Sequence, residues 1–279
     1  YFESKGKGVS VKFYDTNNKD VRALYQQAVD SGSELVIGPL TKNNVEILSR
    51  SNLAVPTIAL NDVDNITTKN LYQFSIDPQN EAEQLATKIY NDGFRNALII
   101  APAGNWGQSI AQTFLQKWQQ QGGRLVDKLY FDNKTNINAS VKTLLNVSDS
   151  SQRKNDLVRT IWKRPKFYPR RRQDFDVVVL LSYASKARQI RPMLKYYYAG
   201  NVPVYGTSLL YSGSPKPQSD VDLNGIIFGE MPYLLKNPKS LINKTWPEQF
   251  NSYNRLFAMG KDASLLSHQL NQLQLFPMM

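Results

Sequence analysis

Short apolar runs that alternate with helical patterns constrain this chain more than any other feature of its sequence. The apolar run Leu35–Ile37 is followed by the turn Gly38–Pro39 and then by a helical pattern that begins at Thr41. A short, continuous apolar run of this kind is typical of a parallel strand that is covered on both faces. The same order of strand, helix and strand recurs along the chain, which predicts an α/β fold with parallel sheets and right-handed crossovers.

The alternation falls into two groups, and this predicts two Rossmann-like lobes. A chain of 279 residues with 41% hydrophobic residues can supply a core for each lobe. Residues 1–76 are expected to form the first part of lobe I and residues 77–231 to form lobe II. Residues 232–279 are expected to return to lobe I as two C-terminal helices. The expected strands are Val9–Asp15, Leu35–Ile37, Pro56–Leu60, Leu71–Ile76, Ala97–Ala101, Leu125–Phe131, Phe175–Leu181, Val202–Ser208 and Gly225–Pro232.

The charge balance is basic, with 34 Lys and Arg against 23 Asp and Glu and a formal net charge of +11. Such a balance favours anionic partners, such as nucleic acid, lipid head groups or an acidic polymer. A generally basic proteome explains the same number equally well, because most of the charges are dispersed. The chain has no Cys, so structural disulfides and thiolate metal sites are excluded. Avoidance of Cys suits an oxidising compartment such as a periplasm.

The first residue is Tyr1 and not Met, so the sequence is expected to be a fragment or a processed chain. No apolar run approaches the length of a membrane-spanning helix, and no signal peptide is present. Any membrane attachment is therefore expected to come from an anchor upstream of this segment.

The sequence does not predict an enzyme. His268 is the only His, and it lies in a helical pattern without a nearby nucleophile. Two Ser-x-x-Lys matches, Ser4–Lys7 and Ser151–Lys154, lack the Ser-Asp-Asn and Lys-Thr-Gly elements that a penicillin-binding enzyme also needs. The acidic pairs Asp62–Asp64 and Asp220–Asp222 lack calcium-loop spacing and are interpreted as turns. We expect no catalytic residue, no cofactor and no metal site.

The strand ends suggest a place for a ligand. In open α/β sheets, ligands bind beside the carboxyl ends of the strands, and two such lobes would share a cleft there. Aromatic rings can stack on a ligand, and backbone N–H groups at helix starts can hold an anion. A cleft that is used for little is the simpler interpretation, because a fold alone does not give a function. The expected lining residues are Asn61, Ser75, Asn105, Trp106, Tyr183, Thr207, Ser208 and Tyr211.

One segment, 149–174, interrupts the alternation and is rich in Ser, Lys and Arg. Its first part is predicted to be a short helix through Ile161, and its second part an exposed loop with Trp162, Phe167 and Tyr168 among the cations. A solvated loop is the default interpretation. The alternative is a docking surface for an acidic protein patch or for the anionic cell-wall polymer, whereas too few aromatics are present for nucleic-acid binding. The candidate docking residues are Lys163, Arg164, Lys166, Arg170, Arg171 and Arg172.

A set of phrases in fixed order resembles one known family, the C-terminal domains of LpoA lipoproteins. The resemblance covers essentially the whole chain. Two departures stand out: the apolar first strand ending in Pro-Leu-Ser-Gly is absent, and so are the last strands after Leu275–Pro277. The phrases are Val36–Val45, Val55–Asn61, Tyr72–Pro78, Val204–Gly213, Asp222–Gly225 and Glu230–Pro232.

This resemblance implies a type I periplasmic-binding-protein-like fold and a non-enzymatic role in peptidoglycan synthesis and cell shape. It implies docking on a class A penicillin-binding protein and activation of its transpeptidase activity, with peptidoglycan as a further partner and no nucleic acid. It also implies an outer-membrane lipoprotein on the periplasmic side, whose lipid anchor lies outside this segment. The alternative function is a periplasmic solute-binding module that holds a small ligand in the interlobe cleft.

Overall fold

The computed structural model describes residues 10–162, 166–211, 217–236 and 250–275. The chain forms two compact units, one of Tyr1–Asp77 with Tyr253–Met279 and one of Pro78–Ser252. Each unit contains a parallel sheet with helices, as the α/β prediction required. The second boundary falls after Ser252, whereas the sequence suggested a change at 231.

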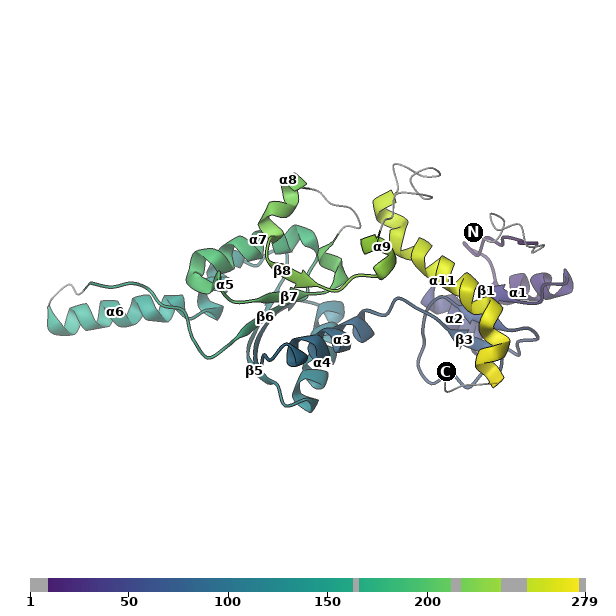
Figure 1. Ribbon diagram of the computed structural model, residues 1–279, viewed down its shortest axis with the longest axis horizontal. Helices are drawn as coiled ribbons and strands as arrows, with labels where there is room; N and C mark the ends of the chain where they lie inside the picture. The colour runs from purple at the N-terminus through teal and green to yellow at the C-terminus, as the bar shows by residue number, and fades with distance from the viewer. Residues whose placement is uncertain (1–9, 163–165, 212–216, 237–249, 276–279) are drawn as a thin grey trace. The chain divides into compact units, whose positions relative to one another are not determined.

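Unit 1 is built on a three-stranded parallel sheet of order β1-β2-β3 (Figure 1). Its helices are α1 before the sheet, α2 between β1 and β2, and the long C-terminal α11, of which most residues belong to this unit. The element bounds are α1 Val21–Asp30, β1 Val36–Ile37, α2 Lys42–Leu48, β2 Thr57–Ala59, β3 Leu71–Gln73 and α11 Phe250–Leu275.

The core of unit 1 lies between the sheet and its first two helices. Tyr25 of α1 packs with Leu48 of α2, and its hydroxyl bonds both the carbonyl and the N–H of Val55. Asp20 caps α1 by accepting from the N–H of Arg22, which satisfies one of the donors that a helix start leaves unpaired. Gly38 has a φ of +120°, a backbone conformation open to glycine, so the chain can turn sharply after β1.

One expectation for this unit was wrong. Residues 10–15, predicted as a strand, form no strand in the described part, where β1 pairs only with β2. A strand needs a neighbour to satisfy its backbone groups, and an alternating pattern alone does not supply one. The start of the first expected C-terminal helix, near Trp246, lies outside the described residues, and α11 contains the residues expected for the second one, Ala263 to Leu273.

Unit 2 is built on a five-stranded parallel sheet of order β5-β4-β6-β7-β8. Helices α3 and α4 cover one face, and α5 and α7 cover the other (Figure 1). The central strand β6 is buried at all four positions, which explains its continuous apolar sequence. The bounds are α3 Pro78–Asn91, β4 Asn96–Pro102, α4 Asn105–Gln120, β5 Arg124–Phe131, α5 Ile137–Leu144, β6 Val177–Leu180, α7 Ala184–Leu194, β7 Val204–Gly206 and β8 Ile226–Phe228.

Shorter elements complete unit 2. Helix α6, Val147–Ile161, follows α5 and extends away from the sheet (Figure 1). Pro192 lies inside α7, which passes into the π-helical turn η2, Lys195–Ala199. There Tyr198 adopts a left-handed conformation with a φ of 66°. The others are η3 Ser208–Leu210, α8 Pro217–Asp220, η4 Val221–Leu223 and α9 Pro232–Lys236. None of the helices searched in the described chain has the length and apolar content that crossing a membrane requires.

Candidate functional site

The carboxyl edge of the unit 2 sheet gathers most of the predicted cleft residues. Asn105 and Trp106 begin α4 directly after β4, and Tyr183 follows β6. The rings of Trp106 and Tyr183 stack on each other, with centroids 5.5 Å apart and planes 15° apart. Their side chains remain 38% and 54% exposed. The structure therefore brings these two residues together, but each occupies a ring face that a ligand would need.

The backbone at the end of β7 is also engaged. The N–H of Ser208 donates to the carboxylate of Glu81 in α3, and the Ser208 hydroxyl donates to the second Glu81 oxygen at 3.1 Å. The Glu81 carboxylate thus occupies the backbone N–H group that the sequence suggested for an anionic ligand. The neighbouring Thr207 is buried, and its hydroxyl has no hydrogen-bond partner within the described residues. Tyr211 packs against Phe228 of β8, with ring centroids 5.6 Å apart.

The two predicted lining residues of unit 1 lie near the carboxyl ends of its strands. Asn61 follows β2, and its amide donates to the carbonyl of Leu40 at 2.9 Å while its side-chain oxygen accepts from the N–H of Asp62. Asn61 therefore holds two loops together. Ser75 follows β3 and is partly buried. The interlobe cleft itself stays a prediction.

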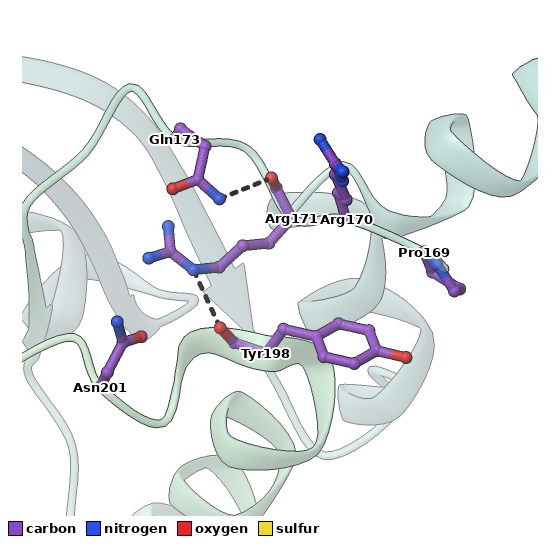
Figure 2. Close-up of a pocket in the computed structure, with 6 residues that line it drawn as sticks. All are labelled: Pro169, Arg170, Arg171, Gln173, Tyr198 and Asn201. Carbon is purple, nitrogen blue, oxygen red and sulfur yellow. Dashed lines mark hydrogen bonds between the residues drawn. The ribbon is translucent and has the colours of Figure 1, made fainter. Parts of the chain in front are cut away.

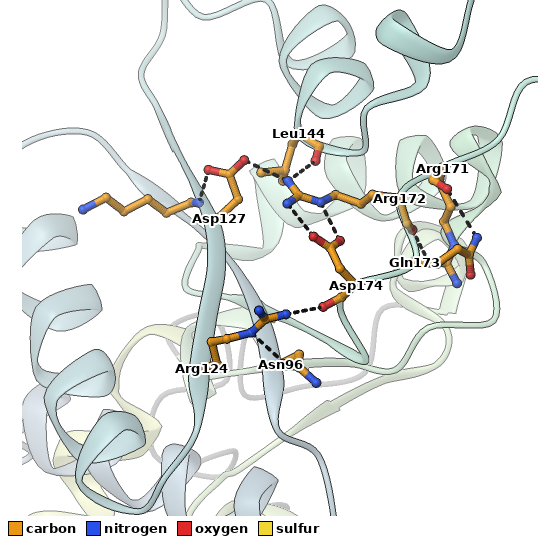
Figure 3. Close-up of polar contacts among 9 residues, drawn as sticks. Asn96, Arg124, Asp127, Leu144, Arg171, Arg172, Gln173 and Asp174 are labelled. Carbon is orange, nitrogen blue, oxygen red and sulfur yellow. Dashed lines mark hydrogen bonds and ion pairs between the residues drawn. The ribbon is translucent and has the colours of Figure 1, made fainter.

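The opposite, amino edge of the unit 2 sheet holds the end of residues 149–174, the Lys- and Arg-rich stretch that we call the basic segment. Arg124 begins β5 and donates to the Asn96 side chain at 3.0 Å and to the Asp174 carbonyl at 3.3 Å (Figure 3). Asp176 accepts from the backbone N–H groups of Arg95 and Asn96. These bonds attach the segment that enters β6 to the start of the sheet. The cleft candidates of unit 2 and the basic segment therefore lie at opposite edges of one sheet.

Arg172 is the structural anchor of this segment. Its guanidinium donates to both oxygens of Asp174, at 2.8 and 2.9 Å, and to Asp127 of β5 at 2.9 Å (Figure 3). It also donates to the carbonyl of Leu144 at the end of α5. These hydrogen bonds hold the pKa of Asp174 below its usual value and raise the pKa of Arg172. The prediction that Arg172 belongs to an exposed docking loop was wrong, because its side chain is only 14% exposed.

Arg171 points to a different place. Its Nε donates to the Tyr198 carbonyl at 2.9 Å (Figure 2). One terminal nitrogen donates to the Arg172 carbonyl at 2.7 Å. The guanidinium also lies 4.9 Å from the centre of the Phe175 ring. Burial lowers the pKa of Arg171, which nevertheless stays charged at all physiological pH values.

A pocket of about 450 Å³ opens beside Arg171 (Figure 2). The sequence predictions did not find this pocket. The three aromatic residues Tyr196–Tyr198 were a weak signal for it, but their position opposite residues 169–173 depends on the packing of η2. The lining residues are Pro169, Arg170, Arg171, Gln173, Tyr198 and Asn201.

Two further candidates, Lys166 and Arg170, belong to a projecting element that we call the basic arm, namely residues 147–162 together with residues 166–170. Lys166 and Arg170 are exposed, as predicted for a docking loop. The arm is held by the N–H of Arg170, which donates to the Ser150 hydroxyl, and by Lys154, whose ammonium lies 5.9 Å from the Phe167 ring centre. The candidates Lys163 and Arg164 lie outside the described residues. Large apolar or aromatic side chains are exposed on the arm at Leu157, Ile161, Trp162 and Tyr168.

Two further titratable residues singled out in the sequence, Asp220 and His268, contact other groups of the protein. Asp220 pairs with Arg188 at 2.9 Å, and His268 Nδ1 lies 2.8 Å from the Ser264 carbonyl one helical turn earlier in α11. Among the residues that the structure describes, no three His, Cys, Asp or Glu side chains group together as they would around a metal ion.

Comparisons with known proteins agree with this architecture. A family model described as "LppC putative lipoprotein" matches residues 3–279. The chain is 28% identical over 281 residues to a protein of Vibrio vulnificus named penicillin-binding protein activator LpoA. The match covers 96% of this chain and 46% of that protein, so the chain spans about half the length of this relative.

Two solved structures show the fold. The LpoA (YraM) C-domain of Haemophilus influenzae, described as a regulator of PBP1A, superposes with a TM-score of 0.72 at 23% identity, covering 100% of this chain and 81% of that one. An ABC transporter substrate-binding protein of Desulfitobacterium hafniense has a TM-score of 0.53 at 17% identity, covering 94% and 72%. The predicted periplasmic-binding-protein-like fold and the resemblance to LpoA are confirmed, and the chain belongs to the LppC lipoprotein family.

Proposed function

We propose that this chain is part of a non-enzymatic activator of a class A penicillin-binding protein, the synthase that crosslinks peptidoglycan. The observation that carries the proposal is the match of nearly the whole chain to relatives named penicillin-binding protein activators. An activator acts through contact with its enzyme, so a regulatory role needs a docking surface and not a catalytic site. The family name further supports a lipoprotein on the periplasmic side of the outer membrane, attached by a lipid anchor outside this segment.

The basic arm is the docking surface that the geometry supports best. Residues 153–172 contain nine Lys or Arg and one acidic residue, Asp156. Trp162 is 92% exposed and Tyr168 is 81% exposed. Trp, Tyr and Arg are the residue types that most often dominate binding energy at protein interfaces. A basic surface also steers an acidic partner into contact and raises its association rate. The proposed partner surface is therefore an acidic patch on the synthase with a pocket for an aromatic ring.

The test is to mix the purified chain with the detergent-solubilised synthase and to measure both binding and crosslinking. The docking variant combines Lys166→Glu with Arg170→Glu. The matched control combines Lys128→Glu with Lys134→Glu, two exposed cations of unit 2 outside the arm. We expect the docking variant to weaken binding by about tenfold or more, and the control to leave it within about twofold.

Two results would count against this proposal. Absence of binding between the intact parent lipoprotein and the synthase would reject the activator role itself. Equal weakening by both pairs of substitutions would reject the arm as the docking surface while leaving the activator role intact. Trp162→Ala is a second docking variant, which leaves the charge of the arm unchanged. Because the Trp162 side chain is exposed, its removal should not affect folding.

The alternative of a solute-binding module receives less support from unit 2. Trp106 stacks on Tyr183, and the Ser208 N–H already binds the Glu81 carboxylate. An amino-acid-like ligand would have to displace both contacts. Its signature would be a melting temperature that rises with ligand concentration, since a ligand that binds only the folded state stabilises it.

A further inference from the structure

The pocket beside Arg171 has a cation at its wall without an acidic partner. Within the described residues, the guanidinium donates only to backbone carbonyls, those of Tyr198 and Arg172. Burial alone shifts its pKa, and no neighbouring carboxylate contributes. The adjacent Arg172 shows the contrast, because two carboxylates neutralise it. A partly buried cation without a counter-charge is well suited to receive an anion from outside.

The guanidinium is also held in place before any ligand arrives. Its two donated hydrogen bonds and the ring of Phe175 fix its plane. Figure 2 shows the terminal nitrogens of Arg171 pointing into the space between the side chains of Gln173 and Asn201. Because little side-chain entropy remains to be lost, a carboxylate can bind with both oxygens at small cost.

The other lining groups add neutral polar contacts and an aromatic ring. Gln173 and Asn201 carry side-chain amides, which both donate and accept hydrogen bonds. Tyr198 is 52% exposed and lies at the rim beside Pro169, and Arg170 supplies a second cation. A volume of about 450 Å³ lies within the range of small-molecule sites.

From this arrangement we propose that the pocket binds a carboxylate-bearing saccharide. Arg171 binds the carboxylate, Gln173 and Asn201 bind hydroxyl or acetamido groups, and the Tyr198 ring covers an apolar face of the sugar. An acidic peptide would also use the two arginines and the amides, but its backbone has no broad apolar face to lie on the exposed Tyr198 ring, whereas a pyranose ring has one. The pocket shares Pro169 and Arg170 with the basic arm, but Arg171, Gln173, Tyr198 and Asn201 lie outside the arm. The inference rests on these four residues, so it does not depend on the proposed docking of the synthase.

The test uses the full chain and two amino sugars that differ in one group. N-acetylmuramic acid carries a carboxylate, and N-acetylglucosamine is the same amino sugar without it. We expect the first to shift the NMR signals of the Arg171 Nε–H and the Asn201 side-chain amide. The second should bind about tenfold more weakly or worse, because it lacks the group that Arg171 recognises.

Two variants separate recognition from folding. Asn201→Asp keeps the size of the side chain but places a negative charge at the pocket, and we expect it to weaken binding of N-acetylmuramic acid by at least about tenfold. Asn133→Asp, at an exposed position outside the pocket, is the matched control and should bind as the wild type does. Arg171→Lys keeps the charge but loses the planar fork, so it should bind more weakly with an unchanged spectrum elsewhere.

Each other outcome overturns the proposal. Equal binding of both sugars removes the role of the carboxylate. Shifts caused by a triglutamate peptide but not by either sugar would assign the pocket to an acidic peptide. Absence of shifts at Arg171 and Asn201 in a wild-type chain with a well-dispersed spectrum would show that the pocket binds no such saccharide.

Discussion

Arg172 and Asp174 form a two-point ion pair, with Nε to Oδ1 at 2.8 Å and Nη2 to Oδ2 at 2.9 Å. Together with Asp127 and the Leu144 carbonyl, this pair ties the end of the basic segment to β5 and α5 (Figure 3). Arg171, one residue earlier, turns to Tyr198 instead. Two adjacent arginines therefore have different roles, because one is neutralised inside the fold and the other borders an open pocket.

Replacing Asp174 by Asn should destabilise unit 2 by about 1 kcal/mol at neutral pH, a modest value because nearly half of the Asp174 side chain is exposed. The folded-state pKa of Asp174 is lowered by Arg172, so the pair stabilises the fold above the unfolded pKa of about 3.9 and this contribution is lost as the pH falls through the lower folded value. Hydrogen exchange of unit 2 amides at pH 7 and pH 3 measures the difference in unfolding free energy between the wild type and Asp174→Asn. This difference should be smaller at pH 3. A constant difference at both values would show that charge is not responsible.

Tyr205 should make unit 2 sensitive to alkaline pH. Its hydroxyl donates to Asp92 at 2.6 Å, and burial with this bond raises the pKa of Tyr205 from 10.0 to about 12. A raised folded pKa means that its stabilisation is complete below pH 10.0 and is lost as the pH rises toward about 12. Tyr205→Phe should remove this dependence and cost about 1 kcal/mol at neutral pH. Urea unfolding of both proteins between these pH values is the measurement, and parallel pH profiles would contradict it.

Gly107 in α4 should not tolerate a side chain. A Cβ there would lie 2.2 Å from the backbone carbonyl oxygen of Pro102, so the helix would have to move away from β4. Gly107→Ala is expected to destabilise unit 2 by about 1–3 kcal/mol. The matched control is Gly229→Ala, whose Cβ meets nothing within 4 Å and whose effect should stay within about 0.5 kcal/mol. Thermal unfolding followed by circular dichroism compares the two, and equal losses would indicate a general cost of removing glycine.

Trp106→Ala should show which of the two edges of the unit 2 sheet carries the docking surface. The stacked pair with Tyr183 is exposed, so its loss should cost no more than about 1.5 kcal/mol. If the synthase docks on the basic arm at the other edge, crosslinking activity should be stimulated by Trp106→Ala as fully as by the wild type. Loss of stimulation with retained folding would instead place the docking surface at the carboxyl edge.

The α/β class and most of the strands and helices of unit 2 could be predicted from local sequence patterns. Apolar runs such as Phe175–Leu181 and helix starts such as Asp77–Pro78 are local signals, and the structure places β6 and α3 there. The parallel order followed as well, since strands that alternate with helices must cross over in one direction.

The contacts between distant side chains could not be predicted in this way. Glu81 and Ser208 are 127 residues apart in the sequence, and no local pattern connects them. Arg171 and Arg172 belong to the same basic run, yet the attachment of that run to β5 buries the second and directs the first to Tyr198. Propensity and periodicity act over a few residues, whereas ion pairs, pockets and sheet edges depend on distances in space that folding alone sets.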